Sequence, residues 1–253
     1  MAFGFNYRGT GAVFTIDRPE KRNAVNGEVM DGLSAAVEEA AGNNSLRYFA
    51  VTGAGGAAFC SGGDLSEFHR LKTAEEAAPM LEKMADILLR MSRLPVPVIA
   101  LINGHAVGGG CEIATACDYR LVHETARCGY IQGTLAITTG WGGASHLLAK
   151  AGSEAIALRM LTESRVHPAG ELIKSGWATE GFADEPDVAL DRFVAPLERI
   201  HPSVIRAYKA AALRKREAAG LEEMIRAEVA ECARLWEAEA HHEAVGLFLN
   251  KKK

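Results

Sequence analysis

The chain has 253 residues, enough to bury a large core in one domain or in one domain with a helical appendage. Hydrophobic residues make up 48% of it and charged residues 24%, which is ordinary for a globular protein. The net charge of −4 gives no electrostatic reason to expect nucleic acid or an anionic membrane surface as a partner.

The sequence indicates a cytoplasmic protein. Residues 1–8 lack a basic segment followed by an apolar stretch, so they do not resemble a signal peptide. No run approaches the roughly 18 apolar residues of a membrane span. The five cysteines form no C-x-x-C pair, which favours reduced thiols rather than disulfides.

The first part of the chain alternates between strand-like and helical segments. Strands are expected at 12–17, 47–52, 96–102 and 119–123, where short runs rich in β-branched and other apolar residues lie between Gly, Pro or Asn. Helical periodicity is found at 28–41 and at about 74–92, where a methionine-rich stripe is expected to be core. Alternating strands and helices indicate an α/β fold.

The remainder of the chain is predicted to be helical. Helices are expected at 154–161, 168–175, 203–218 and 221–240. We therefore expect a core over 1–195 and a helical C-terminal region over 196–253 that is suited to oligomerisation.

Two glycine-rich segments, 59–64 and 108–112, are the most informative part of the sequence. Glycine leaves the backbone uncovered, so that N–H groups in such loops can approach a ligand closely. The second segment follows a predicted buried strand and opens a short helix, which places Glu112 one turn inside the helix. If both loops face one cleft, two amides can stabilise an oxyanion while Glu112 moves a proton. Glu in a first helical turn is also common because of the helix dipole alone, and both readings stay open.

A third glycine-rich segment, 53–58, contains a G-x-G-x-x-A pattern after a predicted strand. A dinucleotide site requires that turn to open a helix, and here 59–63 interrupts any helix. We therefore do not expect a nicotinamide cofactor.

At these residues the chain resembles the crotonase family of enoyl-CoA hydratases and isomerases. The resemblance runs in order through 16–25, 58–65, 103–112, 117–120, 140–143 and 243–249. It implies a spiral of ββα turns with a helical C-terminal region, assembled as a homotrimer or hexamer. It also implies an acyl-CoA substrate, with coenzyme A carried by the substrate and neither a further cofactor nor a metal.

The resemblance also assigns residues. It implies an oxyanion hole made by the N–H groups of Ser61 and Gly109, and Glu112 as acid or base. The further positions matching the family's substrate-binding residues are Arg22, Ala24, Gly63, Asp64, Leu65, Val107, Leu135 and Trp141. Trp141 is expected beside the acyl pocket, as a packing residue or as a limit on acyl chain length.

The chain departs from the family's hydratases at one position. Hydratases use two glutamates that flank one water, and the second corresponds to Gln132 here. An amide orients water or a carboxylate, but it does not donate and recover a proton near neutral pH. Because an acid–base group typically contributes about 10²–10⁴-fold in rate, the change bears directly on the reaction.

Three hypotheses follow for the function. The first is a hydratase or isomerase acting on an enoyl-CoA with Glu112 as acid/base. The second is an alkylmalonyl-CoA decarboxylase with Gln132 facing the departing carboxylate, in which an ionised Glu112 would repel that carboxylate. The third, from another class, is a non-catalytic acyl-CoA-binding or RNA-binding relative, which a salt-sensitive RNA complex without thioester turnover would indicate.

Overall fold

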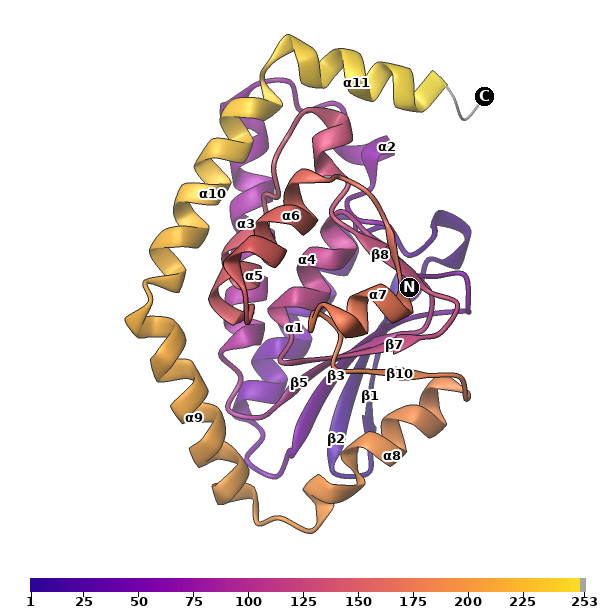
Figure 1. Cartoon of the computed structure of the whole chain (residues 1–253), viewed down its shortest axis with the longest axis vertical. Helices are drawn as coiled ribbons and strands as arrows, with labels where there is room; N and C mark the ends of the chain where they lie inside the picture. The colour runs from indigo at the N-terminus through magenta and orange to yellow at the C-terminus, as the bar shows by residue number, and fades with distance from the viewer. Residues whose placement is uncertain (251–253) are drawn as a thin grey trace.

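The computed structural model describes residues 1–250 as a mixed α/β protein (Figure 1). Lys251–Lys253, expected to form a solvated tail, lie outside the described residues. The strands are β1 (Phe3–Arg8), β2 (Gly11–Ile16), β3 (Tyr48–Gly53), β4 (Ala58–Cys60), β5 (Val98–Ile102), β6 (His105–Val107), β7 (Tyr119–His123), β8 (Arg127–Gly129), β9 (His167–Pro168) and β10 (Glu180–Phe182).

The helices alternate with these strands and then dominate the C-terminal third. They are η1 (Pro19–Lys21), α1 (Gly27–Gly42), α2 (Leu65–Phe68), α3 (Ala74–Ser92), α4 (Gly109–Ala116), η2 (Gln132–Leu135), α5 (Gly143–Lys150), α6 (Glu154–Thr162), α7 (Ala169–Lys174), α8 (Pro186–Glu198), α9 (Pro202–Ala218), α10 (Leu221–Trp236) and α11 (Glu239–Asn250). Within residues 1–250, no helix combines the length and apolar character needed to cross a membrane.

The larger sheet has six strands in the order β1-β2-β3-β5-β7-β10. All neighbouring pairs are parallel except β1 and β2. The four strands expected from the sequence are β2, β3, β5 and β7, within one or two residues at each end. β1 and β10 were not expected, because these edge strands are largely half-buried or exposed and show little of the apolar run that marks a strand.

The smaller sheet, β4-β6-β8-β9, brings the glycine loops together. β4 pairs with β6 and β6 with β8 in parallel, so the C-terminal ends of all three lie at one edge. The loops that follow β4 and β6 are those at 61–64 and 108–109. These strands have only three residues each, too few for a pattern to identify them in the sequence.

The central helix α3 has the predicted bounds. Thr73 and Glu76 form a reciprocal capping box at its start, which satisfies backbone N–H groups of the first turn. Met84, Leu88 and Met91 are fully or almost fully buried in the main core, as the stripe predicted. Helix α10 packs along α3 and adds Ile225 and Val229 to the same core (Figure 1).

The C-terminal part of the chain differs from the prediction at α8, which was not expected, and at the end of α10. The single helix expected over 221–240 is wrong, because α10 ends at Trp236 and α11 starts in a new direction at Glu239 (Figure 1). The Trp236 indole N–H donates to the Leu71 carbonyl and His241 Nδ1 contacts the Leu135 carbonyl, at 2.9 and 2.7 Å. These two contacts stabilise the change of direction between α10 and α11. The periodicity of apolar residues in the sequence does not indicate it. The predicted division at 195/196 falls inside α8 and stays a prediction.

Candidate active site

The two glycine loops meet at the start of α4. Gly62 has φ of +90° and Gly108 has φ of +57°, conformations that residues with side chains rarely adopt. A Cβ atom added to Gly62 would lie 3.1 Å from the Gly109 nitrogen, and one added to Gly110 would lie 2.1 Å from the Cys60 carbonyl oxygen. The backbones therefore touch at a distance that only glycine permits.

The backbone N–H groups of these loops differ in whether they already donate a hydrogen bond within the protein. The Ser61 N–H donates to the Arg22 carbonyl oxygen at 3.1 Å. The loop around Gly63 is held by its neighbours, since Val25 N–H donates to Gly62 and Asp64 N–H donates to Val25. Among residues 1–250, the N–H groups of Gly63 and Gly109 have no hydrogen-bond partner. Both residues line the same cavity.

Glu112 lies at the base of this cavity, with only 3% of its surface exposed. Its carboxylate accepts hydrogen bonds from the backbone N–H groups of Trp141 at 2.7 Å and Gly143 at 2.9 Å. The Gly140 N–H lies at 3.4 Å. A Cβ on Gly143 would approach Glu112 Cγ to 2.4 Å, so the 140–143 turn closes directly on the carboxylate.

Burial raises the pKa of the Glu112 carboxyl to about 8, and the nearby charge of Glu228 is the second cause. The hydrogen bonds from Trp141, Gly143 and Gln132 act in the opposite direction but do not cancel the burial. A carboxyl with this pKa carries a proton at neutral pH and is able to donate it.

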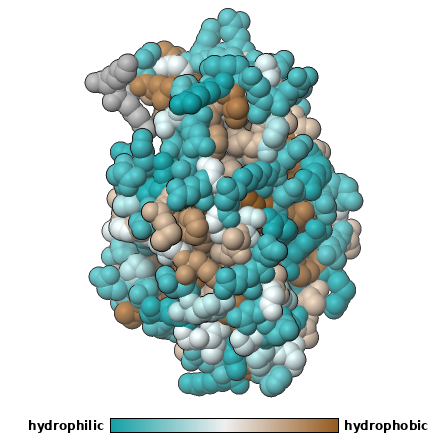
Figure 2. All heavy atoms as spheres, turned by 180° about the vertical axis from the view of Figure 1, so that it is seen from behind, coloured by the Kyte–Doolittle hydropathy of each residue, from teal (hydrophilic) through white to brown (hydrophobic). Residues whose placement is uncertain are grey.

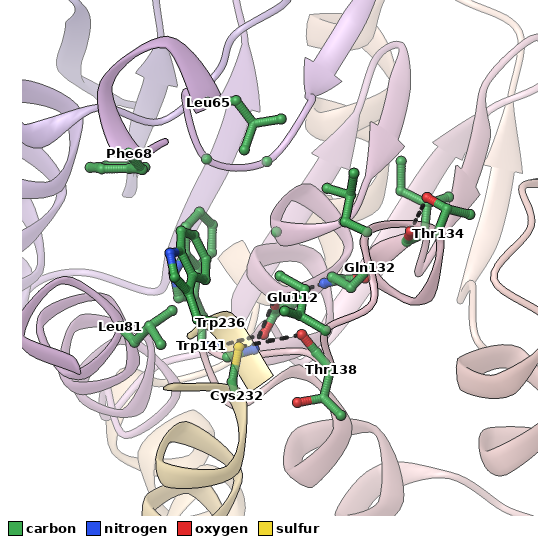
Figure 3. A pocket seen from close by; sticks show the side chains of 18 of the residues that line it. Leu65, Phe68, Leu81, Glu112, Gln132, Thr134, Thr138, Trp141, Cys232 and Trp236 are labelled. Carbon is green, nitrogen blue, oxygen red and sulfur yellow. Dashed lines mark hydrogen bonds between the residues drawn. The ribbon is translucent and has the colours of Figure 1, made fainter. Parts of the chain in front are cut away.

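Gln132 is the first residue of η2 and points at Glu112 (Figure 3). Its Nε2 donates to Glu112 Oε1 at 2.9 Å. Its Oε1 is buried and has no partner among the described residues. The position that departs from the hydratase pattern is therefore in direct contact with the candidate acid.

The cavity above these groups is narrow and apolar, with a volume of about 120 Å³. Its apolar wall is formed by Leu65, Phe68, Met80, Leu81, Ile131, Leu135, Ile137, Trp141, Trp236 and Phe248. Trp141 contributes its indole, which packs against Gly109 so closely that a Cβ there would lie 2.2 Å from Cζ3. Such a site suits a small acyl group beside a few polar atoms.

Four of the predicted substrate-binding residues lie outside this wall. Asp64 caps α2 through the Ser66 N–H and forms an ion pair with Arg18 at 2.8 Å, so it shapes the loop. Arg22 is exposed at φ +52° next to η1, and Ala24 and Val107 lie near the loops without entering the cavity. Their roles toward a substrate stay predictions.

Sequence reasoning missed the part of the wall that comes from the C-terminal helices. Cys232 and Trp236 on α10 and Phe248 on α11 line the cavity (Figure 3 shows the first two). Glu228, also on α10, approaches the turn that holds Glu112. These residues lie about 90 or more positions after the loops they face, and no spacing pattern connects such distant segments.

A model of one protein family matches the chain over residues 8–253, and that family is enoyl-CoA hydratase/isomerase. The chain belongs to the enoyl-CoA hydratase/isomerase family. The crotonase resemblance found in the sequence is thereby confirmed.

Relatives of this family member include enzymes named for two reactions. Mouse ethylmalonyl-CoA decarboxylase is 32% identical over 92% of this chain and 73% of its own length. The decarboxylase of Xenopus tropicalis is 35% identical over 64% of this chain and 54% of that protein. Short-chain-enoyl-CoA hydratase of Clostridium acetobutylicum is 37% identical over 55% of this chain and 53% of that enzyme. The alignments thus span about half the length of the frog and clostridial proteins.

Solved structures confirm the fold over nearly all of the chain. An enoyl-CoA hydratase from Mycobacterium avium subsp. paratuberculosis superposes with a TM-score of 0.86 at 23% identity, over 97% of this chain and 98% of that one. Carnitinyl-CoA hydratase from Mycobacterium avium has a TM-score of 0.83 at 27% identity, over 99% and 96% of the two chains. The mixed α/β architecture with a helical C-terminal region is therefore the crotonase fold.

Proposed function

We propose that this protein decarboxylates an alkylmalonyl-type CoA thioester. The observation that carries the proposal is the pair formed by Gln132 and Glu112, in which an uncharged amide stands where a hydratase has its second acid. A protonated Glu112 removes the repulsion that an ionised carboxylate would exert on a substrate carboxylate. The likeness to ethylmalonyl-CoA decarboxylase over 92% of the chain supports the same reaction.

In this proposal the thioester carbonyl oxygen accepts hydrogen bonds from the N–H groups of Gly63 and Gly109. We place Gly63 where the resemblance had suggested Ser61, because the Ser61 N–H already donates to the Arg22 carbonyl. Amides fixed in position before the reaction stabilise a developing oxyanion without reorganising, and one such donor is typically worth about 10²–10³-fold in rate.

The reaction proceeds in two steps. The bond between the α-carbon and the substrate carboxylate breaks and CO₂ leaves. The electron pair of that bond stays on the substrate as an enolate, whose oxygen accepts hydrogen bonds from the two amides. The Glu112 carboxyl then donates its proton to the α-carbon, which gives the saturated acyl-CoA, and regains a proton from solvent. Coenzyme A enters and leaves as part of the substrate and product.

A second candidate is hydration or isomerisation of an enoyl-CoA. It is favoured by the buried, unpartnered Gln132 Oε1, which is able to accept a hydrogen bond from a water molecule beside Glu112. Isomerisation requires one group to move one proton, and Glu112 is sufficient for that.

The test compares ethylmalonyl-CoA and crotonyl-CoA as substrates of the wild type, Glu112→Gln and Gln132→Glu. We expect CO₂ release from ethylmalonyl-CoA by the wild type, and a loss of about 10²-fold or more in both variants. Glu231→Gln, on the exposed face of α10, is the matched control and should behave as wild type. Hydration of crotonyl-CoA that Gln132→Glu accelerates would instead establish the second candidate.

A further inference from the structure

Glu228 connects the C-terminal helix α10 to the turn that holds Glu112. Its carboxylate accepts hydrogen bonds from Ser145 N–H at 2.8 Å, Ser145 Oγ at 2.6 Å and Ala144 N–H at 3.2 Å. These groups belong to the first turn of α5, whose N-cap is Gly142 at φ +89°. Because glycine has no side chain to cap the helix, Glu228 caps it from another element.

The same stretch of backbone serves two carboxylates. Glu112 accepts hydrogen bonds from the N–H groups of Trp141 and Gly143. Glu228 accepts them from the N–H groups of the next two residues, Ala144 and Ser145. Successive amides at a helix N-terminus form a positive pocket that favours negative charge. Two carboxylates that share such a pocket also repel each other, which favours one proton between them.

We propose that Glu228 is a positioning residue for the reaction, which fixes the turn that carries the amides around Glu112 and through which α10 acts on the Glu112 carboxyl. The inference rests on the proposed function only in assigning Glu112 as the proton donor. Glu228 acts through the turn and through its charge and does not line the cavity.

Burial distinguishes the two carboxyl groups, since Glu112 is only 3% exposed whereas Glu228 is half-buried. Glu228 has a hydroxyl donor in addition to two amides, and it sits at the positive end of α5. Glu112 is the more deeply buried, and Glu228 is the leading charge that raises its pKa. Removing that charge is therefore expected to lower the pKa of Glu112.

The other groups packed around Glu112 do not supply a competing charge. Burial raises the pKa of the thiols of Cys111 on α4 and Cys232 on α10, so both are neutral near pH 7. Burial lowers the pKa of His146 on α5 well below its ordinary value, so this ring is neutral as well. Gln132 is uncharged. Burial lowers the pKa of Lys150 well below its ordinary value, and its side-chain nitrogen contacts the carbonyls at the opposite end of α4.

The experiment is a pH profile of kcat for the wild type and for Glu228→Gln, with whichever CoA thioester the protein turns over. In the wild type, kcat is expected to fall as pH rises past about 8, because Glu112 loses its proton. In Glu228→Gln the same fall is expected about one pH unit lower. A uniform loss of kcat with an unmoved profile would mean that Glu228 only caps α5, and would overturn the inference.

Two variants separate capping from charge. Ser145→Ala removes one hydrogen bond to Glu228 and leaves its charge, so the profile should keep its position or move slightly to higher pH. Glu231→Gln removes a charge from the exposed face of α10, where Glu231 pairs with Arg234, and should leave the profile unchanged. A shift in Glu231→Gln equal to that in Glu228→Gln would indicate a general field effect and contradict the inference.

A second readout does not depend on turnover. Difference infrared spectra recorded against pH follow the C=O band of protonated carboxyl groups, with Glu112→Gln as the blank. The Glu112 band should persist to about pH 8 in the wild type and disappear at lower pH in Glu228→Gln. Infrared agreement without decarboxylation would disprove the proposed function alone, whereas an unmoved band would disprove the role of Glu228.

Discussion

At the scale of single residues, the site is governed by conflicting influences on Glu112. Hydrogen bonds from three donors favour its ionised form, whereas burial and the charge of Glu228 favour the protonated form. Desolvation is the largest of these influences, because almost none of the side chain reaches solvent. The resulting pKa of about 8 suits the proton-donating role that we propose for Glu112.

The raised pKa of Glu112 predicts how stability changes with pH. The unfolded chain loses this proton near pH 4.5 and the folded protein only near pH 8, so between these values the unfolded state binds fewer protons. The free energy of unfolding should therefore fall as pH rises from 4.5 to 8, by up to roughly 4 kcal/mol.

The measurement is urea unfolding of the wild type and of Glu112→Gln between pH 4.5 and 9. The variant has no proton to lose at this position, so it should lack this component of the slope and gain stability relative to wild type at high pH. Parallel curves for the two proteins would show that Glu112 is ionised throughout the range.

Gly109 is predicted to tolerate no side chain while Trp141 is present. A Cβ atom there would lie 2.2 Å from the indole Cζ3, so the alanine variant must displace the ring or the amide. If the amide binds the thioester oxygen, kcat should fall by about 10²-fold. Adding Trp141→Phe, which removes the bulk of the indole, should restore part of the rate.

Gly56→Ala is the matched control for this series. A Cβ at Gly56 would meet nothing within 4 Å, so its kinetics should equal those of the wild type. Kinetics for Gly109→Ala as good as those of this control would remove Gly109 from the reaction.

At the scale of elements, α4 links the site to the rest of the fold. Its N-terminus presents the Gly109 amide, and its C-terminal carbonyls accept hydrogen bonds from the buried side-chain nitrogen of Lys150. Lys150 Nζ lies at 2.6, 2.7 and 3.0 Å from the oxygens of Thr115, Ala116 and Cys117. Burial lowers the pKa of Lys150 well below its ordinary value, so hydrogen bonding to these carbonyls is its main contribution.

Lys150→Met is predicted to destabilise the fold through α4. The side chain keeps most of its length but leaves three carbonyl groups without their donor, and the free energy of unfolding should fall by about 2–4 kcal/mol. Denaturant unfolding measures this change. The control Lys174→Met, on the exposed face of α7, should change stability by no more than about 0.5 kcal/mol. Equal stability of the two variants would show that the contacts of Lys150 contribute little.

At the scale of the whole molecule, apolar side chains remain at the surface. Figure 2 shows hydrophobic residues among hydrophilic ones on the face opposite to that of Figure 1, including an area over α11. Leu148 on α5 and Ile156 and Leu158 on α6 are 36%, 40% and 54% exposed, on two helices that pack together. Exposed apolar groups of this kind are frequent where copies of a chain associate.

The assembly is predicted to be a homotrimer or hexamer, as the family resemblance implies. Light scattering after size exclusion should give three or six times the chain mass of 27.0 kDa. Leu158→Glu should reduce the mass if α6 lies in the interface, whereas Val188→Glu, equally exposed on α8, is the control. A wild-type monomer at micromolar concentration would contradict the prediction.

The sequence alone determined the features that depend on local pattern. Strands β2, β3, β5 and β7 and helix α3 were predicted because apolar periodicity and turn residues operate over a few neighbouring positions. The glycine loops and Glu112 were recognisable for the same reason, since a loop that exposes its backbone amides requires glycine, and a run of glycines is visible in the sequence.

Only the tertiary structure decided which amides and which carboxylates lie together. The hydrogen bond from Ser61 to Arg22 spans about 40 residues, and the contacts of Glu228 with α5 span more than 80. The break between α10 and α11 likewise depends on contacts with distant loops. Such contacts follow from how elements pack, and packing is selected by the shape and burial of the whole core rather than by any local pattern.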